Sequence, residues 1–430
     1  MKAALRLLLV TTTLVLAGHA FGEVLRTAEP VTVDVSPDRL SRIRTVLQKE
    51  IDADRMPGAV VMIARRGKLI YSEAIGFQDK TAGKPMTKDA IFRIYSMTKP
   101  LSSVAAMMLV EEGRMQLTDP VAKFLPQFAK MEVLVPDKDG KTTREIAKRQ
   151  ITIHDLFRHT AGLAYGEFSS SPELKAAYAE AKLFQPEGIL AESRMITPEQ
   201  FTTGIAKAPL VHEPGTTWEY SMAVDVLGRV VEAVSGQRLS AYLDERLPLQ
   251  MVDTGFRVPE PKWSRIAEPL PKDPLTGGPN AAMLDVKIDP LNDSGGGGGV
   301  STAADYLRFC QMMLNGGTLD GRMYLSPTSV KLMTSDHLGN RPVSPATPGA
   351  LLMGVDGYTF GLGFMVRQGP GLAGVPGSEG EYMWAGAGGT FFWIDPKEQL
   401  AVVYMAQTPG AIRPYYRRMI KALVAQALEN

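Results

Sequence analysis

The sequence predicts an α+β fold with one antiparallel sheet built from both ends of the chain. Apolar runs of β-strand character occur early, over residues 58–65 and 69–77, and return after residue 360. The stretch between them is mainly helical in pattern. We therefore expect a sheet flanked by helices, an all-helical subdomain inserted between its two halves, and a cleft where the two parts meet.

The composition is that of an ordinary globular protein. The chain has 430 residues, of which 45% are hydrophobic and 22% are charged. A net charge of +1 gives no electrostatic reason to expect nucleic acid or an anionic membrane as a partner. The single cysteine, Cys310, excludes an internal disulfide framework and a cysteine-rich zinc site.

The N-terminus predicts an export signal over residues 1–20. Lys2 and Arg6 supply positive charge, residues 7–17 are mostly apolar, and Gly18-His19-Ala20 offers small residues for cleavage after Ala20. The alternatives are an uncleaved membrane anchor, for which the apolar run is short, and a disordered start. We expect no stable membrane insertion, and a location in the bacterial periplasm or outside the cell.

The first elements follow from apolar spacing and turn residues. Residues 36–55 predict an amphipathic helix, with Ser36-Pro37 as its cap. The strands Gly58–Arg65 and Leu69–Phe77 should form a hairpin around Arg66-Gly67. A helix from Pro100 to Gly113 comes next.

The middle predicts helices over 153–159 and 220–235, the second of which stops at Gly236. Residues 255–299 are rich in Pro and Gly and predict loops that end in five consecutive glycines, Gly295 to Gly299. That run is consistent either with a flexible tether or with a tight, close-packed crossing.

The C-terminal part predicts a helix followed by strands and a final helix. The ranges are 303–315 and 413–428 for the helices, and 360–366, 382–385, 390–394 and 400–406 for the strands. We therefore expect a discontinuous α/β subdomain over residues 30–115 and 296–430, and a mainly helical subdomain over residues 116–295.

Ser96-Met97-Thr98-Lys99 is the stretch with the clearest chemical potential. Residues i and i+3 share a helix face, so the Lys99 amine can lie beside the Ser96 hydroxyl. An adjacent amine can activate a serine, and N–H groups at a helix start can stabilise an oxyanion. The alternative is a capping serine followed by a solvated lysine.

Three motifs in order resemble the serine β-lactamase and penicillin-binding-protein superfamily: Ser96-Met97-Thr98-Lys99, Tyr220-Ser221-Met222 and Trp384-Ala385-Gly386. Within it, the chain looks most similar to class C β-lactamases and family VIII carboxylesterases. Segments 156–163, 299–305 and 392–396 agree, so the resemblance covers nearly everything from about residue 36 onwards.

The resemblance implies catalytic roles for Ser96, Lys99 and Tyr220. Tyr220 would be the general base, and Lys99 would supply a cation beside it. The backbone N–H groups of Ser96 and Ala387 would form the oxyanion hole. Without the resemblance, a core tyrosine with a hydrogen-bonded hydroxyl would be the simpler interpretation of Tyr220.

The substrate side departs from the β-lactamase pattern. Met222 stands where those enzymes have an asparagine, and Trp384, in the element that ends at Gly386, stands where they have a lysine. A tryptophan offers an apolar face suited to neutral acyl or alcohol groups, although Trp384 could instead be a structural aromatic. We expect Trp384, Gly386, Met222 and His159 near the substrate, with His159 stabilising the turn before Gly162.

Competing sites find little support. The sequence has no Gly-x-Ser-x-Gly elbow and no His-Glu-x-x-His motif, so neither an α/β-hydrolase site nor a zinc hydrolase is favoured. We expect no metal and no organic cofactor. Arg413, Arg417 and Arg418 are predicted to form a solvated helix face.

These observations predict a serine hydrolase that cleaves carboxylic esters through an acyl-enzyme on Ser96. The alternatives are a β-lactamase, D-alanyl peptidase or amidase of the same fold, an acyltransferase, and a non-catalytic cell-wall-binding module. The partner would be a small ester or a β-lactam-like molecule. The sequence does not predict the oligomeric state.

Overall fold

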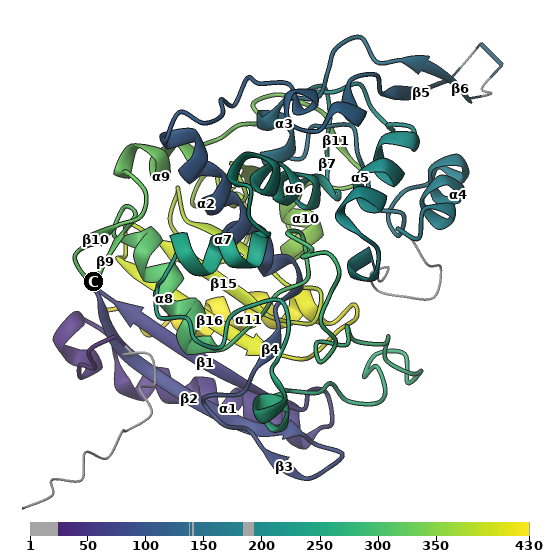
Figure 1. Ribbon diagram of the computed structural model, residues 1–430. Coiled ribbons are helices and arrows are strands. Elements are labelled where there is room, and N and C mark those ends of the chain that lie inside the picture. The colour runs from purple at the N-terminus through teal and green to yellow at the C-terminus, as the bar shows by residue number, and fades with distance from the viewer. Residues whose placement is uncertain (1–24, 137, 140–141, 184–192, 430) are drawn as a thin grey trace, which may run out of the picture.

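The computed structural model describes residues 25–136, 138–139, 142–183 and 193–429 (Figure 1). The predicted export signal lies outside these residues and stays a prediction. Within them, no helix combines the length and the apolar character that a membrane span needs.

An eight-stranded sheet forms the centre of the molecule, and each pair of neighbouring strands is antiparallel. As predicted, both ends of the chain contribute, because Ala59 near the start pairs with Ala406 near the end. The strand order is β12 (Tyr358–Phe360), β13 (Met365–Arg367), β14 (Tyr382–Ala385), β15 (Phe391–Asp395), β16 (Leu400–Ala406), β1 (Gly58–Arg65), β2 (Lys68–Asp79) and β3 (Lys84–Pro85).

Helices cover the central strands. α8 (Ala303–Leu314) packs on β16, β1 and β15, while α1 (Pro37–Asp52) packs on β2 and β1 and against α11 (Arg413–Ala425) (Figure 1). All eight residues of β1 are buried. This explains why the strand reads as a continuous apolar run rather than as an alternating one.

The second part of the molecule is built around α6 (Ala223–Ser235), which contacts four other helices. These are α2 (Thr98–Glu111), α3 (Ile153–Phe157), α5 (Pro198–Lys207) and α7 (Leu239–Arg246), and α4 (Pro172–Glu180) packs on α5. This part is not purely helical. It also carries the hairpin β5 (Glu132–Pro136) with β6 (Thr142–Ile146), in which the apolar side chains of β5 face polar neighbours on β6.

Short elements complete the fold. They are α9 (Pro327–Met333), α10 (Pro348–Met353), and the strand pairs β4 (Phe92–Arg93) with β8 (Val300–Ser301), β7 (Trp218–Glu219) with β11 (Val343–Ser344), and β9 (Thr318–Leu319) with β10 (Arg322–Met323). The predicted subdomain boundaries near residues 116 and 295 stay a prediction.

One predicted strand is wrong. Residues 360–366 do not form a single strand but the turn of the hairpin between β12 and β13. The Gly361 N–H donates to the Phe364 carbonyl at 2.8 Å, and Gly363 adopts a φ of +90°. A left-handed backbone of this kind is open to glycine without a steric cost, which breaks the apolar run in two.

The five glycines from Gly295 to Gly299, which we call the glycine strap, form a close-packed crossing and not a tether. A Cβ atom on Gly296 would lie 2.0 Å from Asp225 Oδ2, and one on Gly299 would lie 2.6 Å from Thr98 Oγ1. The strap therefore needs glycine in order to pass between the starts of α2 and α6.

Candidate active site

Ser96 lies in a single 3₁₀ turn, Tyr95–Met97, that leads directly into α2. The preceding residue, Tyr95, has a φ of +43°, which is unfavourable for a bulky side chain. Thr98 holds the turn: its Oγ1 donates to the Tyr95 carbonyl at 2.6 Å and accepts from the Gly299 N–H at 2.9 Å. The surrounding structure thus fixes a strained backbone immediately before the serine.

Tyr220 contacts Ser96, and Lys99 lies beside the Tyr220 ring. The Tyr220 hydroxyl donates to Ser96 Oγ at 2.6 Å. The ammonium nitrogen of Lys99 lies 4.7 Å from the centre of the Tyr220 ring. A serine, a phenol and a cation from segments 124 residues apart therefore share one site.

Lys99 is expected to lie beside Ser96, but the hydrogen bonds of its ammonium group are made to other groups. No hydrogen bond among the described residues joins the two side chains. Lys99 is 1% exposed, and its Nζ donates to the Gly296 carbonyl at 2.6 Å and to the Tyr165 hydroxyl at 2.9 Å. A buried ammonium needs such acceptors, and they hold it 4.7 Å from the centre of the Tyr220 ring.

Tyr165 is a site residue that the sequence analysis missed. Its ring lies 5.2 Å from the ring of Tyr220, centre to centre. Burial, followed by the nearby Tyr220, raises the pKa of Tyr165 well above its usual value, so this phenol stays protonated. It therefore accepts a hydrogen bond from Lys99 without competing with Tyr220 for the proton of Ser96.

Asp225 links the glycine strap to the rest of the site. This buried carboxylate in the first turn of α6 accepts from the Gly296 N–H at 3.0 Å and from the Ser294 hydroxyl at 2.5 Å. The same Gly296 offers its carbonyl to Lys99. Since α6 begins shortly after Tyr220, one helix positions both the phenol and the acceptor that holds the ammonium.

The segment that follows β14 forms another wall of the site. A Cβ atom on Gly386 would lie 2.4 Å from the Ile94 carbonyl, so glycine is required for this strand to approach the turn of Ser96. The Ala387 N–H has no acceptor among the described residues. Its role with the Ser96 N–H in an oxyanion hole stays a prediction.

Two arginines of α11 hold this wall, which corrects the prediction that they are solvated. Arg413 Nη1 donates to the Ala387 carbonyl and Arg417 Nη2 to the Gly386 carbonyl, both at 2.9 Å. Arg417 is 4% exposed, and Arg418 of the same helix binds the Met353 carbonyl. A helical spacing of charges could not reveal that these side chains reach backbone carbonyls of the sheet.

The Trp384 ring packs against the Tyr220 ring. It is 1% exposed, and its ring centre lies 5.3 Å from those of both Tyr220 and Phe360. The observed role is to support the phenol. Direct contact between Trp384 and a substrate stays a prediction.

His159 and Met222 also support the Tyr220 segment. His159 Nδ1 lies 3.3 Å from the Ser221 N–H, from which it accepts, and 3.2 Å from the Ser221 hydroxyl. Burial, then the charge of Lys99, lowers the pKa of His159 well below its usual value, so the ring is neutral. Met222 is 5% exposed and lines a small cavity together with Tyr165 and Asp225. Substrate contacts of His159 and Met222 stay predictions.

Within the described residues, no cluster of three or more His, Cys, Asp or Glu side chains is arranged to hold a metal ion. The polar groups around Ser96 are instead those of nucleophilic catalysis: a hydroxyl, a phenol, an ammonium and a free backbone N–H.

Comparison with known proteins shows the family to which the chain belongs. The beta-lactamase family model matches residues 43–426. An uncharacterised protein of Mycobacterium tuberculosis is 38% identical, over 84% of this chain and 88% of that protein. Esterase EstB of Burkholderia gladioli is 31% identical, over 86% of this chain and 90% of that protein.

A solved structure shares the fold. EstCE1, described as a hydrolase with promiscuous acyltransferase activity, superimposes with a TM-score of 0.71 at 27% identity, over 91% of this chain and 99% of that one. The sheet order, the turn of Ser96 and the match over nearly the whole chain lead to one conclusion: this chain belongs to the beta-lactamase family.

Proposed function

We propose that this protein is a serine hydrolase that cleaves carboxylic esters through an acyl-enzyme on Ser96. The observation that carries the proposal is the 2.6 Å hydrogen bond between the Tyr220 hydroxyl and Ser96 Oγ, with the Lys99 ammonium 4.7 Å from the same ring. The names of EstB and of a lovastatin esterase from Penicillium rubens, which is 30% identical over 84% of this chain, support esters as the substrate class.

Acylation would begin with proton transfer between Ser96 and Tyr220, whose side chains are already hydrogen-bonded. The step requires that Tyr220 has first lost its own proton; beside the Lys99 ammonium, it then takes the proton of Ser96 as Oγ attacks the ester carbonyl carbon. The oxyanion rests on backbone N–H groups that include that of Ala387. Collapse of the tetrahedral intermediate breaks the bond to the alcohol, and Tyr220 gives its proton to the departing oxygen.

Deacylation repeats these steps with water. Tyr220 takes a proton from the water as its oxygen attacks the acyl carbon, and then returns a proton to Ser96 Oγ as the acid leaves. The Tyr165 hydroxyl and the Gly296 carbonyl keep Lys99 in place throughout, because neither group loses or gains a proton in the cycle.

Efficient β-lactam turnover fits the site less well. Met222 cannot make the hydrogen bonds that an asparagine amide makes in the related β-lactamases, and Trp384 places a buried aromatic where those enzymes have a lysine. Transfer of the acyl group to an alcohol other than water is the second candidate, favoured by the acyltransferase activity in the description of EstCE1.

The test compares Ser96→Ala with Ser103→Ala. Ser103 lies on the helix that follows Ser96, is fully buried, and has a hydroxyl without a partner among the described residues, so it is a matched control. We expect Ser96→Ala to abolish hydrolysis of p-nitrophenyl butyrate and Ser103→Ala to retain it. Retained turnover in Ser96→Ala would refute the assignment of Ser96 as the nucleophile.

A parallel assay separates the substrate classes. Nitrocefin turnover far above that of p-nitrophenyl butyrate would favour a β-lactamase instead. Ester products formed when acceptor alcohols are added would establish acyl transfer. Failure of a fluorophosphonate probe to label Ser96 would favour a non-catalytic binding module.

We also propose that the protein is exported. The support is the charged, apolar and small-residue pattern of residues 1–20. Cell fractionation, with N-terminal sequencing of the mature protein, tests this: an N-terminus at Phe21 would support export, and a cytoplasmic protein that retains residues 1–20 would contradict it.

A further inference from the structure

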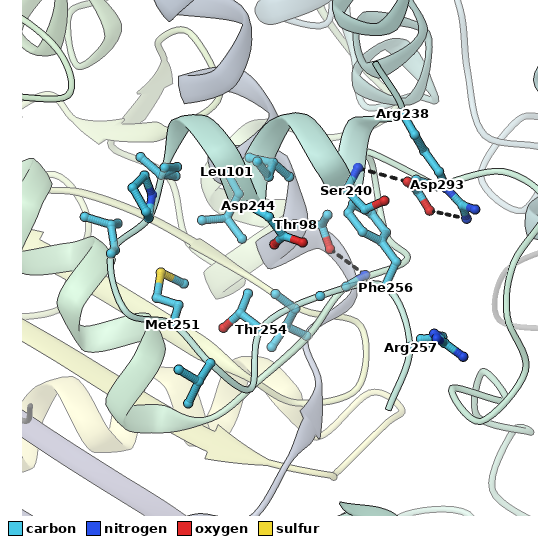
Figure 2. Close-up of a pocket in the computed structure, with 18 of the residues that line it drawn as sticks. Thr98, Leu101, Arg238, Ser240, Asp244, Met251, Thr254, Phe256, Arg257 and Asp293 are labelled. Atoms are coloured by element: carbon cyan, nitrogen blue, oxygen red, sulfur yellow. Dashed lines mark hydrogen bonds and ion pairs between the residues drawn. The ribbon is translucent and has the colours of Figure 1, made fainter. Parts of the chain in front are cut away.

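A second cavity lies behind the turn of Ser96, between α2, α7 and the segment that follows α7 (Figure 2). Its volume is about 510 Å³, within the range of small-molecule sites. Neither Ser96, Lys99 nor Tyr220 lines it. It is therefore distinct from the site proposed for ester cleavage.

The walls of this cavity are mainly apolar. The side chains that line it include Leu101, Leu243, Leu249, Met251 and Phe256. Figure 2 shows Leu101 and Met251 on opposite sides of the space. Such a surface favours a ligand with a hydrocarbon body, because burying that body removes apolar area from water on both partners.

Two acidic residues at the edge of the cavity already have partners. Arg238 donates to both carboxylate oxygens of Asp293, at 2.8 and 2.7 Å. Asp289 lies 3.8 Å from the guanidinium of Arg257. These charges cancel in pairs and leave nothing for a ligand to neutralise.

Asp244 differs from them. Among the described residues its carboxylate accepts no hydrogen bond and makes no ion pair, and Figure 2 shows it directed into the cavity beside Leu101. Partial desolvation, followed by the negative charge of Asp293, raises the pKa of Asp244 above its usual value, although the residue as a whole is exposed. When it is ionised, the Asp244 carboxylate places a negative charge at this cavity that no side chain among the described residues pairs with.

We propose that this cavity binds a small amphiphilic amine, with the ammonium on Asp244 and the hydrocarbon body along Leu101, Leu243 and Met251. An ammonium can form an ion pair with this carboxylate, whereas a neutral or anionic amphiphile leaves it to water. Charge complementarity therefore selects the ammonium, and the apolar walls select the chain attached to it.

The bound amine would lie against the back of the nucleophile turn. Thr98 and Gly299 both line the cavity, and their hydrogen bond holds the strained Tyr95 backbone in place. Because neither Ser96 nor Tyr220 lines the cavity, the amine would not occupy the space of an ester at Ser96.

The experiment is isothermal titration of the purified protein with n-octylamine below its micelle concentration at pH 7, with n-octanol as the neutral analogue. This measurement requires no turnover, so its result is independent of ester cleavage. We expect saturable binding of one octylamine. In Ser96→Ala the affinity for octylamine should be unchanged.

Three variants locate the ligand. Asp244→Asn should weaken octylamine about 5-fold and change octanol less than about 2-fold, as expected for loss of a partly exposed ion pair. Met251→Trp, which fills the cavity, should weaken both ligands. Glu245→Gln removes the same charge from the next residue, which does not line the cavity, and should leave both affinities unchanged.

The proposal is overturned if octylamine shows no saturable binding, or if Asp244→Asn and Met251→Trp both bind it as tightly as the original protein. It is also overturned if Asp244→Asn weakens octylamine and octanol equally, because the ammonium would then not be on this carboxylate. Asp244 is an exposed residue replaced by its isostere, so the variant should keep its fold, which circular dichroism checks.

Discussion

Replacing Tyr165 by phenylalanine tests how Lys99 is held. The change removes one oxygen atom and leaves the ring in place beside Tyr220. Lys99 then keeps the Gly296 carbonyl as its remaining recorded acceptor, at 2.6 Å. Because Lys99 is 1% exposed, water cannot readily take the place of the lost phenol.

The size of the effect follows from the bond that is lost. A hydrogen bond to a charged group contributes about 1.5–3 kcal/mol. If that energy holds Lys99 where it stabilises the phenolate of Tyr220 in the transition state, kcat/KM for p-nitrophenyl butyrate should fall roughly 10- to 150-fold. The loss should appear mainly in kcat, since Tyr165 is not expected to bind the ester itself.

Tyr242→Phe is the matched control for this experiment. Tyr242 is 2% exposed, and its hydroxyl has no hydrogen-bond partner among the described residues. Removing that hydroxyl should leave kcat/KM unchanged. If Tyr165→Phe retains the original kcat/KM, then its hydrogen bond to Lys99 does not contribute to catalysis, and the argument for a positioned ammonium is refuted.

Two further variants test the parts that support the site. Gly296→Ala places a Cβ atom 2.0 Å from Asp225 Oδ2, so it should cost about 1–3 kcal/mol of stability and cause a large loss of activity. The control Gly371→Ala, whose new Cβ meets no atom within 4 Å, should change neither stability nor activity. Equal behaviour of the two variants in thermal melts and ester assays would contradict this. Asp155→Asn tests pH-dependent stability. Burial opposes ionisation of Asp155, but hydrogen bonds, led by that of Arg149, lower its pKa from 3.8 to about 2. A depressed carboxylate pKa contributes stability above pH 3.8 that is lost as the pH falls through 2, worth about 2 kcal/mol here. Urea unfolding at pH 4 and pH 2 should show this loss in the original protein and a smaller one in Asp155→Asn, and identical losses would disprove the assignment.

Local patterns in the sequence were sufficient for most of the fold. The helix after Ser36 and the strand Gly58–Arg65 are correct because a capping serine, a proline and a continuous apolar run act within a few residues. The predicted strand over residues 360–366 failed because Gly361 and Gly363 look the same in sequence whether they lie in a strand or reverse it. Periodicity does not report backbone φ.

The residues of the candidate site were also predicted only in part from the sequence. Ser96, Lys99 and Tyr220 could be found because motifs mark them, and the structure places them together. Tyr165 could not, since it lies just beyond the matching segment 156–163 and its role depends on a contact with Lys99 across 66 residues. The backbone bonds of Arg417 depend on packing between α11 and the sheet, which no local pattern encodes.

The order of strands in the sheet has a consequence for the growing chain. Strand β1 is flanked by β16, and the wall that carries the Ala387 N–H is made only after residue 380. A nascent polypeptide that ends before this point would contain Ser96 and Tyr220 but would lack the Ala387 N–H that we propose as a donor to the oxyanion. Biosynthesis therefore delivers the reactive assembly last, and a product truncated at its C-terminus should be chemically inert even if its helices form.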